Sequence, residues 1–140
     1  MNIIIRKADV YDKEQIFCLV KNFATSFEPE IGAFRKSFDN LINDNSAIIL
    51  VAEVNKCIIG YCLGFDHYTF YANGKVAWLE EIMVEESHRK KGTGEMLMKE
   101  FEAWSESRES KLIGLATRRA ASFYTAIGYH ESATFFRKIL

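Results

Sequence analysis

The sequence predicts a mixed α/β (α+β) fold, with a central sheet of six to seven strands flanked by about four helices. At 140 residues the chain is long enough for one hydrophobic core and too short for two, so we expect residues 1–140 to form a single domain. Apolar residues make up 49% and charged residues 26%, which is a globular composition. Strand-like and helix-like runs follow one another without a linker or an internal repeat.

The first half of the chain is expected to form a strand, two helices and a hairpin. Residues 3–5 are a short β-branched run. Asp12 is suited to cap a helix, whose apolar positions follow at helical spacing: Ile16, Phe17, Leu19, Val20 and Phe23. A second helix is expected at about residues 31–43. Residues 47–65 contain two β-rich runs around a turn at residues 54–56, which is typical of a hairpin.

The second half alternates strands and helices. An aromatic loop, HYTFYANGK, separates the hairpin from a strand at residues 76–84. The next helix ends near Ser107 and shows a buried stripe at positions i, i+4 and i+7: Leu97, Phe101 and Trp104. The remaining elements are a strand at residues 111–116, a short helix at residues 119–128 closed by Gly128, and a closing strand at residues 132–140.

The charge distribution argues against nucleic acid as a partner. The formal net charge is −1, and the visible cluster of cations is confined to residues 89–91. Nowhere do eighteen uncharged apolar residues occur together, and the apolar run at the start of the chain is far too short for a signal peptide. We therefore expect a cytoplasmic protein that does not bind membranes.

The cysteines do not indicate a metal site or a disulfide. They form an odd set without a CxxC pair, far in sequence from the three histidines: Cys18, Cys57 and Cys62. The expected role of all three thiols is that of small buried apolar residues.

The stretch HRKKGTGEML, residues 88–97, lies between a strand and a helix and carries two glycines behind three cations. A helix N-terminus has unpaired N–H groups and a partial positive charge, so it stabilises an anion. Gly92 and Gly94 let a phosphate approach the backbone, while Arg89 and Lys91 add charge. The phosphate motifs GxxxxGK[ST] and GxGxxG are both absent here. The spacing alone fits an ordinary turn with solvated cations equally well.

Residues 89–94, RKKGTG, resemble the Gln/Arg-x-x-Gly-x-Gly/Ala loop of the GNAT superfamily of acyl-CoA-dependent N-acyltransferases, in which the loop wraps the pyrophosphate of coenzyme A. LEEIMV, residues 79–84, is similar to the fourth strand of that family. ATRRAASFYTAIGY, residues 116–129, is similar to its fifth strand, short helix and tyrosine region. The order of elements is similar over nearly the whole chain. The resemblance implies a GNAT-like sheet that is splayed between strands 4 and 5, beside Val84.

The resemblance also implies acetyl-CoA as the acyl donor, with no metal, and a set of cofactor-binding residues. These residues are Ile82, Met83 and Val84 on the strand, Arg89, Lys91, Gly92, Gly94 and Glu95 at the loop, and Thr117 and Tyr124 after it. Main-chain N–H groups around Ile82 would polarise the thioester carbonyl. Thr117 stands where many members have Asn, and its hydroxyl cannot offer the donor and acceptor of an amide.

Two adjacent carboxylates are candidates for the general base, which must accept the proton of the attacking amine. The resemblance to polyamine-type members matches Glu80 to their proposed base, and Glu81 is the runner-up. Strand alternation would send the two side chains to opposite faces, with Glu80 grouped with Trp78, Ile82 and Val84. Either carboxylate could instead pair with an arginine or face solvent.

Tyr124 matches the family tyrosine that protonates the sulfur of coenzyme A. An amphipathic packing role is the alternative for this segment, and Phe123 is assigned to the core. The expected walls of the acceptor site are residues 27–34 and 66–74. Acidic side chains there suit a cationic amine and aromatic ones its carbon chain or a homodimer contact: Glu28, Glu30, Asp66, Tyr68, Phe70 and Tyr71.

The function implied is an N-acetyltransferase that moves an acetyl group from acetyl-CoA to a primary amine of a small molecule or peptide, by direct attack in a ternary complex. The alternative is a coenzyme A-binding regulatory or interaction module with little catalytic activity.

Overall fold

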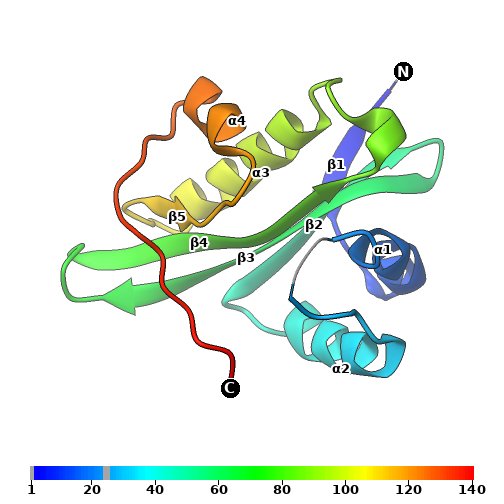
Figure 1. Ribbon diagram of the computed structural model, residues 1–140, viewed down its shortest axis with the longest axis horizontal. Helices are drawn as coiled ribbons and strands as arrows, with labels where there is room; N and C mark the ends of the chain where they lie inside the picture. The colour runs from blue at the N-terminus through cyan, green and yellow to red at the C-terminus, as the bar shows by residue number, and fades with distance from the viewer. Residues whose placement is uncertain (1, 24–25) are drawn as a thin grey trace.

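A five-stranded mixed sheet forms the centre of the computed structural model, which describes residues 2–23 and 26–140 (Figure 1). The strands follow one another across the sheet in chain order. The first four are antiparallel neighbours, and the fifth pairs with the fourth in parallel. Their bounds are Ile4–Lys7 (β1), Ala47–Val54 (β2), Cys57–Thr69 (β3), Gly74–Val84 (β4) and Ile113–Leu115 (β5).

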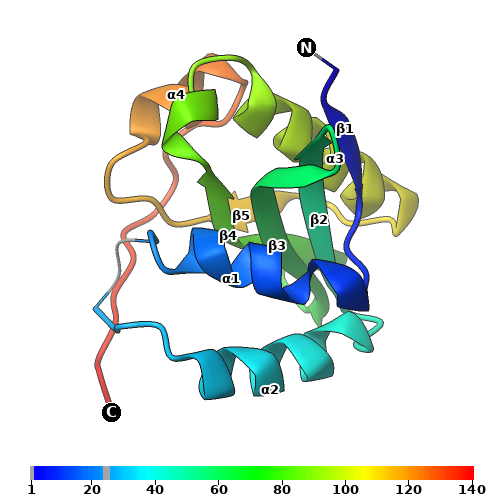
Figure 2. The same ribbon diagram turned by 90° about the vertical axis from the view of Figure 1, so that its right-hand side faces the viewer.

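Within the described residues, four α-helices cover the two faces of this sheet (Figure 2). The first two lie on one face, and the last two lie on the other. Their bounds are Lys13–Val20 (α1), Ile31–Ile42 (α2), Thr93–Ser107 (α3) and Ala121–Ala126 (α4), with 3₁₀ turns at Val10–Asp12 (η1) and Glu86–His88 (η2).

Each face of the sheet has its own core because side chains alternate along the strands. The stripe predicted for the third helix is confirmed, since Leu97 and Phe101 are fully buried and Trp104 packs beside them. Against them lie inward residues of the central strands: Leu50, Ala52, Cys62, Ala77 and Leu79. The opposite core, under α1 and α2, contains Ile16, Leu19, Phe38, Ile49, Val51, Ile58, Tyr61 and Leu63.

The hairpin of β3 and β4 is longer than predicted. Residues expected to form an aromatic loop continue β3 as far as Thr69, and the turn is made tight by Asn73 and Gly74, both at positive φ. Three aromatic side chains near this tip are strongly exposed: Tyr68, Phe70 and Tyr71.

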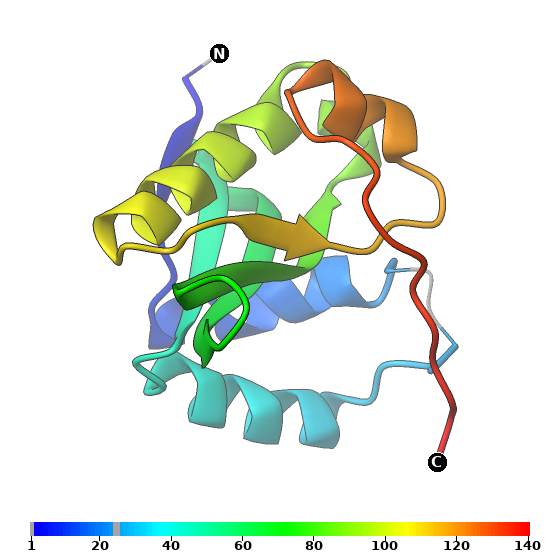
Figure 3. The same ribbon diagram turned by 90° about the vertical axis from the view of Figure 1, so that its left-hand side faces the viewer.

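The prediction of six to seven strands is wrong, because residues 132–140 form no strand in the structure. Their apolar residues come in adjacent pairs, Phe135 with Phe136 and Ile139 with Leu140, so no alternating face fixes a register against a neighbouring strand. Arg137 instead donates a hydrogen bond to the hydroxyl of Ser26 at 2.6 Å. Figure 3 shows this segment running past β5 toward the face that carries α2.

The expected opening between strands 4 and 5 is present. β5 pairs with β4 only at Ala77, Trp78 and Leu79, whereas β4 continues to Val84. Beyond Leu79, β4 is therefore paired with β3 on one side and with no strand of the described residues on the other.

Candidate active site

The glycine loop presents main-chain donors at the start of α3. Lys90 has φ +61° and Gly92 has φ +85°, a left-handed conformation that suits glycine. The first helical hydrogen bond runs from the N–H of Met96 to the carbonyl of Gly92 at 3.0 Å. In the described part of the chain, no acceptor is paired with the N–H groups of residues 90–95. These donors and the helix dipole make a site for an anion.

The space over this loop is open. A Cβ added to Gly92 would meet nothing within 4 Å, whereas one added to Gly94 would lie 3.3 Å from the ring of Phe123. Phe123 is thus half-buried against the first turn of α3, in line with its assignment to the core. The residues present fit a diphosphate, because their main-chain N–H groups are unpaired among the described residues and nothing lies within 4 Å of the Cβ position of Gly92.

The two loop cations predicted to bind the anion, Arg89 and Lys91, have different surroundings. Lys91 is exposed and leaves its ammonium available to an anion. Arg89 is turned toward β4, where its Nε donates to the carbonyl of Val84 at 3.0 Å and its Nη2 lies 3.7 Å from the sulfur of Met83. Arg89 therefore fastens the loop to the end of the strand, a role that the sequence reasoning did not include.

The main chain of β4 faces the opening at alternate residues. The N–H of Ala77 donates toward the β5 side, to Leu112, and the N–H of Glu85 donates toward β3, to Ile59. The one register shift between these positions lies at residues 79–81. Main-chain groups of successive residues point to alternate sides of a strand. Because the main chain of Glu85 faces β3, that of Val84 and that of Ile82 face the opening. Met83 faces β3 with its main chain, so its predicted contact would come from its side chain.

A β-bulge places the two carboxylates on the same face. Glu80 has no partner in β3, because Leu79 pairs with Gly64 and Glu81 pairs with Leu63. Leu79 belongs to the core under α3, whereas Glu81 bonds a tyrosine of the opposite core. Glu80 follows Leu79, so it shares the α1/α2 face with Glu81. The prediction of opposite faces is wrong, because the extra residue interrupts the alternation.

Glu81 is the more constrained of the two carboxylates. Its Oε1 accepts a hydrogen bond from the hydroxyl of Tyr61 at 2.8 Å. Burial raises the pKa of Glu81 above its ordinary value, and the charge of Glu80 adds to this, while the Tyr61 hydrogen bond acts in the opposite direction. Tyr61 was not among the residues predicted for the site; the signal in the sequence is a hydroxyl in the otherwise apolar run CIIGYCLGF.

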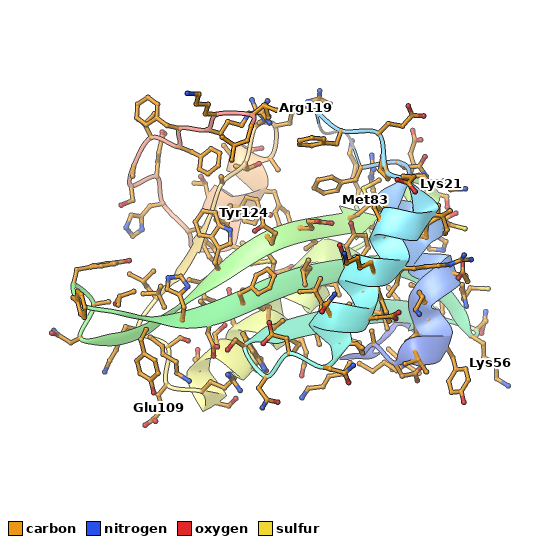
Figure 4. All side chains as sticks on the ribbon, turned by 90° about the horizontal axis from the view of Figure 1, so that it is seen from below. Lys21, Lys56, Met83, Glu109, Arg119 and Tyr124 are labelled. Carbon is orange, nitrogen blue, oxygen red and sulfur yellow. The ribbon has the colours of Figure 1, made fainter. Side chains whose placement is uncertain are left out.

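Tyr124 lies on the other face of the sheet, in α4, with its ring in the core under α3. Figure 4 shows it beside β4, whose end is marked by Met83. Its ring makes edge contacts with Phe123 and Tyr129. Burial, with a smaller effect of Cys62, raises the pKa of Tyr124 to about 12. Its hydroxyl has no partner in the described residues and is not sealed from solvent, so it is free to meet a ligand.

A comparison with known protein families decides the classification. The model of the acetyltransferase (GNAT) family matches residues 13–129. The chain belongs to the GNAT family. A comparison with curated proteins gives no match.

Solved structures share the GNAT fold over the whole chain. A transcriptional regulator from Bacillus halodurans has a TM-score of 0.90 at 20% identity, over 99% of this chain and 100% of its own. Glucosamine-6-phosphate N-acetyltransferase from Arabidopsis thaliana has a TM-score of 0.86 at 19% identity, over 99% of both chains. An aminoglycoside N-acetyltransferase in complex with CoA has a TM-score of 0.83 at 18% identity, over 98% of this chain and 95% of its own.

Two further residues of the predicted site differ in how they are used. Thr117 is exposed after β5, and its hydroxyl accepts a hydrogen bond from the N–H of Ala120 at 3.0 Å, at the start of α4. The O–H donor and one lone pair of this hydroxyl are left for a ligand. Glu95 lies in the first turn of α3, so its predicted contribution is its main-chain N–H.

The predicted acceptor walls are only partly suited to that task. Glu28 and Glu30 are exposed before α2. Asp66 is not available to a cationic amine, because it is buried and forms ion pairs with Arg108 at 2.5 Å and Lys75 at 3.6 Å. The exposed aromatic tip lies at the far end of β4, roughly eight residues or ~26 Å from the opening. Within one chain it cannot line the site.

The remaining predictions concern the burial of the cysteines, a metal site and a membrane-spanning helix. Cys62 is buried as expected, whereas Cys18 and Cys57 are exposed, because they lie on the outer side of α1 and at the start of β3. Among residues 2–23 and 26–140, no group of three or more His, Cys, Asp or Glu is placed to hold a metal ion. No helix in these ranges is long and apolar enough to cross a membrane.

Proposed function

We propose that residues 1–140 act as one cytoplasmic N-acetyltransferase domain, which transfers the acetyl group of acetyl-CoA to a primary amine of a small molecule or peptide. The observation that carries this proposal is the pairing of two unfilled sets of main-chain donors. The N–H groups of residues 90–95 suit a diphosphate, and the open side of Ile82 and Val84 suits the pantetheine arm and thioester.

Acetyl-CoA supplies an activated acetyl group, and the residues of the opening supply charge stabilisation and proton transfer. The N–H of Ile82 is oriented before charge develops on the carbonyl oxygen. A carboxylate on the α1/α2 face takes the proton of the amine as the nitrogen–carbon bond forms. Tyr124, on the opposite face, donates its proton to the sulfur as the carbon–sulfur bond breaks. Base and acid then serve the two sides of one opening.

The choice of base is between the two neighbouring glutamates. The geometry favours Glu81, because its raised pKa and its hydrogen bond to Tyr61 suit a proton acceptor that is held in place. Glu80 is exposed on the same face and would hold the positive charge of an incoming amine. The aminoglycoside and sugar-phosphate enzymes of similar fold support an amine acceptor of this kind.

The proposal is tested by following thiol release from acetyl-CoA with a panel of polyamines, aminoglycosides, amino acids and peptides. We expect turnover with at least one amine and a loss of about 100-fold or more in kcat in Glu81→Gln. A smaller loss, mainly in KM, is expected in Glu80→Gln. Unchanged turnover in both variants would remove the carboxylates from the mechanism.

One observation favours the alternative of a coenzyme A-binding regulatory module. Thr117 stands where many GNAT members have Asn, and its hydroxyl is already used within the turn before α4. Tight coenzyme A binding without turnover of any amine in the panel would support this alternative.

A further inference from the structure

The geometry points to Tyr61 as a positioning residue, whose buried hydroxyl holds the Glu81 carboxylate in place as the proton acceptor of the transfer; this inference rests on the proposed function. Tyr61 lies on β3, opposite Met83 of β4, and is only 2% exposed. Its hydroxyl donates to Oε1 of Glu81 at 2.8 Å. Nothing in the sequence resemblance assigns a role to this tyrosine.

Packing alone does not explain the hydroxyl of Tyr61. The other members of this buried core are all aliphatic or phenylalanine: Ile16, Leu19, Phe38, Ile49, Val51, Ile58 and Leu63. A phenylalanine would fill the same volume without a polar atom. A buried hydroxyl is costly unless it is hydrogen-bonded. The described partner of this hydroxyl is Glu81, so its effect is exerted on that carboxylate.

The proton in this pair belongs to the tyrosine. Burial, and next the charge of Glu81, raise the pKa of Tyr61 well above its ordinary value, so the phenol remains a donor at any working pH. Glu81 is therefore held as an acceptor through Oε1. Its second oxygen has no hydrogen-bond partner in residues 2–23 and 26–140 and is left for the proton of an amine. A carboxylate fixed in this way loses less freedom when it takes the proton.

Two neighbours act on Glu81 in opposite directions. Its burial and the charge of Glu80 from β4 raise the pKa of Glu81, whereas Tyr61 from β3 lowers it. Most charged side chains of the covering helices are engaged elsewhere: Lys13 with Asp39 at 2.6 Å, Glu14 with Arg35 at 3.1 Å, and Lys21 over the ring of Phe17. Lys36, also on α2, is exposed. Removal of the Tyr61 hydroxyl should therefore raise the pKa of Glu81, and removal of the Glu80 charge should lower it.

The first test is the pH dependence of kcat/KM in Tyr61→Phe, with the best acceptor of the amine panel. The base works when ionised, so activity falls at low pH through the pKa of Glu81. Without the hydrogen bond that pKa rises, and we expect the acid limb to move to higher pH. A loss of about tenfold in kcat/KM at neutral pH should accompany it. In Glu80→Gln the limb should move the other way. Tyr11→Phe, at an exposed tyrosine remote from the site, is the matched control and should move nothing.

The second test needs no turnover. The carboxyl carbon of Glu81, followed by NMR in protein labelled at glutamate, should titrate at higher pH in Tyr61→Phe than in wild type. An unchanged or lower pKa would overturn the inference even if the protein acetylates amines. If the expected shift occurs and no amine is acetylated, the proposed function fails, and with it the catalytic part of the inference.

A variant cycle separates positioning from stability. If Tyr61 acts through Glu81, then Tyr61→Phe should lower kcat/KM in wild type and have no further effect in Glu81→Gln. Equal losses in both backgrounds would show a structural role and contradict the inference. Melting temperatures of the wild type, the two single variants and the double variant identify any protein that fails to fold. The comparison is then made among the variants that remain folded.

Discussion

The guanidinium of Arg89 donates a hydrogen bond to the main-chain carbonyl of Val84 at 3.0 Å, which ties the glycine loop to the open end of β4. The two halves of the proposed donor site, one for the diphosphate and one for the thioester, are therefore held at a fixed separation. Arg89 thus holds the loop against the strand, and in the proposed site the main-chain donors of residues 90–95 would bind the diphosphate.

Gly92→Ala tests the left-handed turn of the loop. Gly92 has φ +85° and an added Cβ meets nothing, so the cost is conformational, about 1–2 kcal/mol in the free energy of unfolding. We also expect about tenfold weaker coenzyme A binding by calorimetry. Gly128→Ala is the matched control, since Gly128 has φ +100° and the same open surroundings away from the loop. It should lose similar stability and keep its affinity; equal affinity losses in both variants would contradict the assignment.

Tyr124→Phe removes the proposed proton donor. With a pKa of about 12, the phenol of the wild-type enzyme stays protonated through the working range. Ionisation of Tyr124 should therefore cause no loss of wild-type activity between about pH 7 and pH 10. The variant should lose about 100-fold in kcat with little change in stability, because the hydroxyl has no described protein partner.

Tyr129→Phe supplies the contrast. The Tyr129 hydroxyl donates to Glu102 at 2.6 Å, so this variant should lose about 1 kcal/mol of stability and keep its kcat. A Tyr124→Phe enzyme with wild-type kcat would exclude Tyr124 as the acid.

Asp12→Asn tests the clamp that joins β1 to η1. Asp12 is buried and accepts two hydrogen bonds from Arg6, both at 2.8 Å. We expect the free energy of unfolding to fall by about 2–4 kcal/mol in urea denaturation. Asp9→Asn, at an exposed neighbour 3.9 Å from the same arginine, should cost less than about 0.5 kcal/mol.

The same clamp predicts a pH dependence of stability. The hydrogen bond from Arg6, the main favourable cause, holds the pKa of Asp12 below its ordinary value. The folded state then binds its proton later than the unfolded state as pH falls. The contribution of Asp12 is therefore complete above about pH 4–5 and is lost as pH falls further, toward its folded pKa. Wild type should lose stability more steeply than Asp12→Asn in this range; parallel curves would contradict the prediction.

The sequence was most informative where local pattern and tertiary structure agree. The buried stripe of α3, the hairpin and the position of the glycine loop were all predictable from spacing. The bulge at Glu80 was not, because alternation assumes an uninterrupted ladder and nothing in LEEIMV marks the extra residue. The pairing of Asp66 with Arg108 was likewise hidden, since 42 positions separate them in the chain.

The closing segment shows the limit of propensity. Phe135, Phe136 and Ile139 favour strand structure, yet residues 132–140 lack the alternation that would set a register against β5. The carboxylate pair shows the same dependence on context. The residue types predicted candidates for acid–base chemistry, while the proposed choice between the two glutamates depends on Tyr61, which comes from another strand.

The most direct test of the donor site is a titration of ¹⁵N-labelled protein with coenzyme A, followed through the amide resonances of residues 90–95 and of Ile82 and Val84. We expect these amides to shift together and to saturate with coenzyme A, whereas pantetheine, which lacks the diphosphate, should leave the resonances of residues 90–95 unchanged. If the resonances of residues 90–95 do not shift at saturating coenzyme A, the loop does not bind the diphosphate and the proposed donor site is wrong.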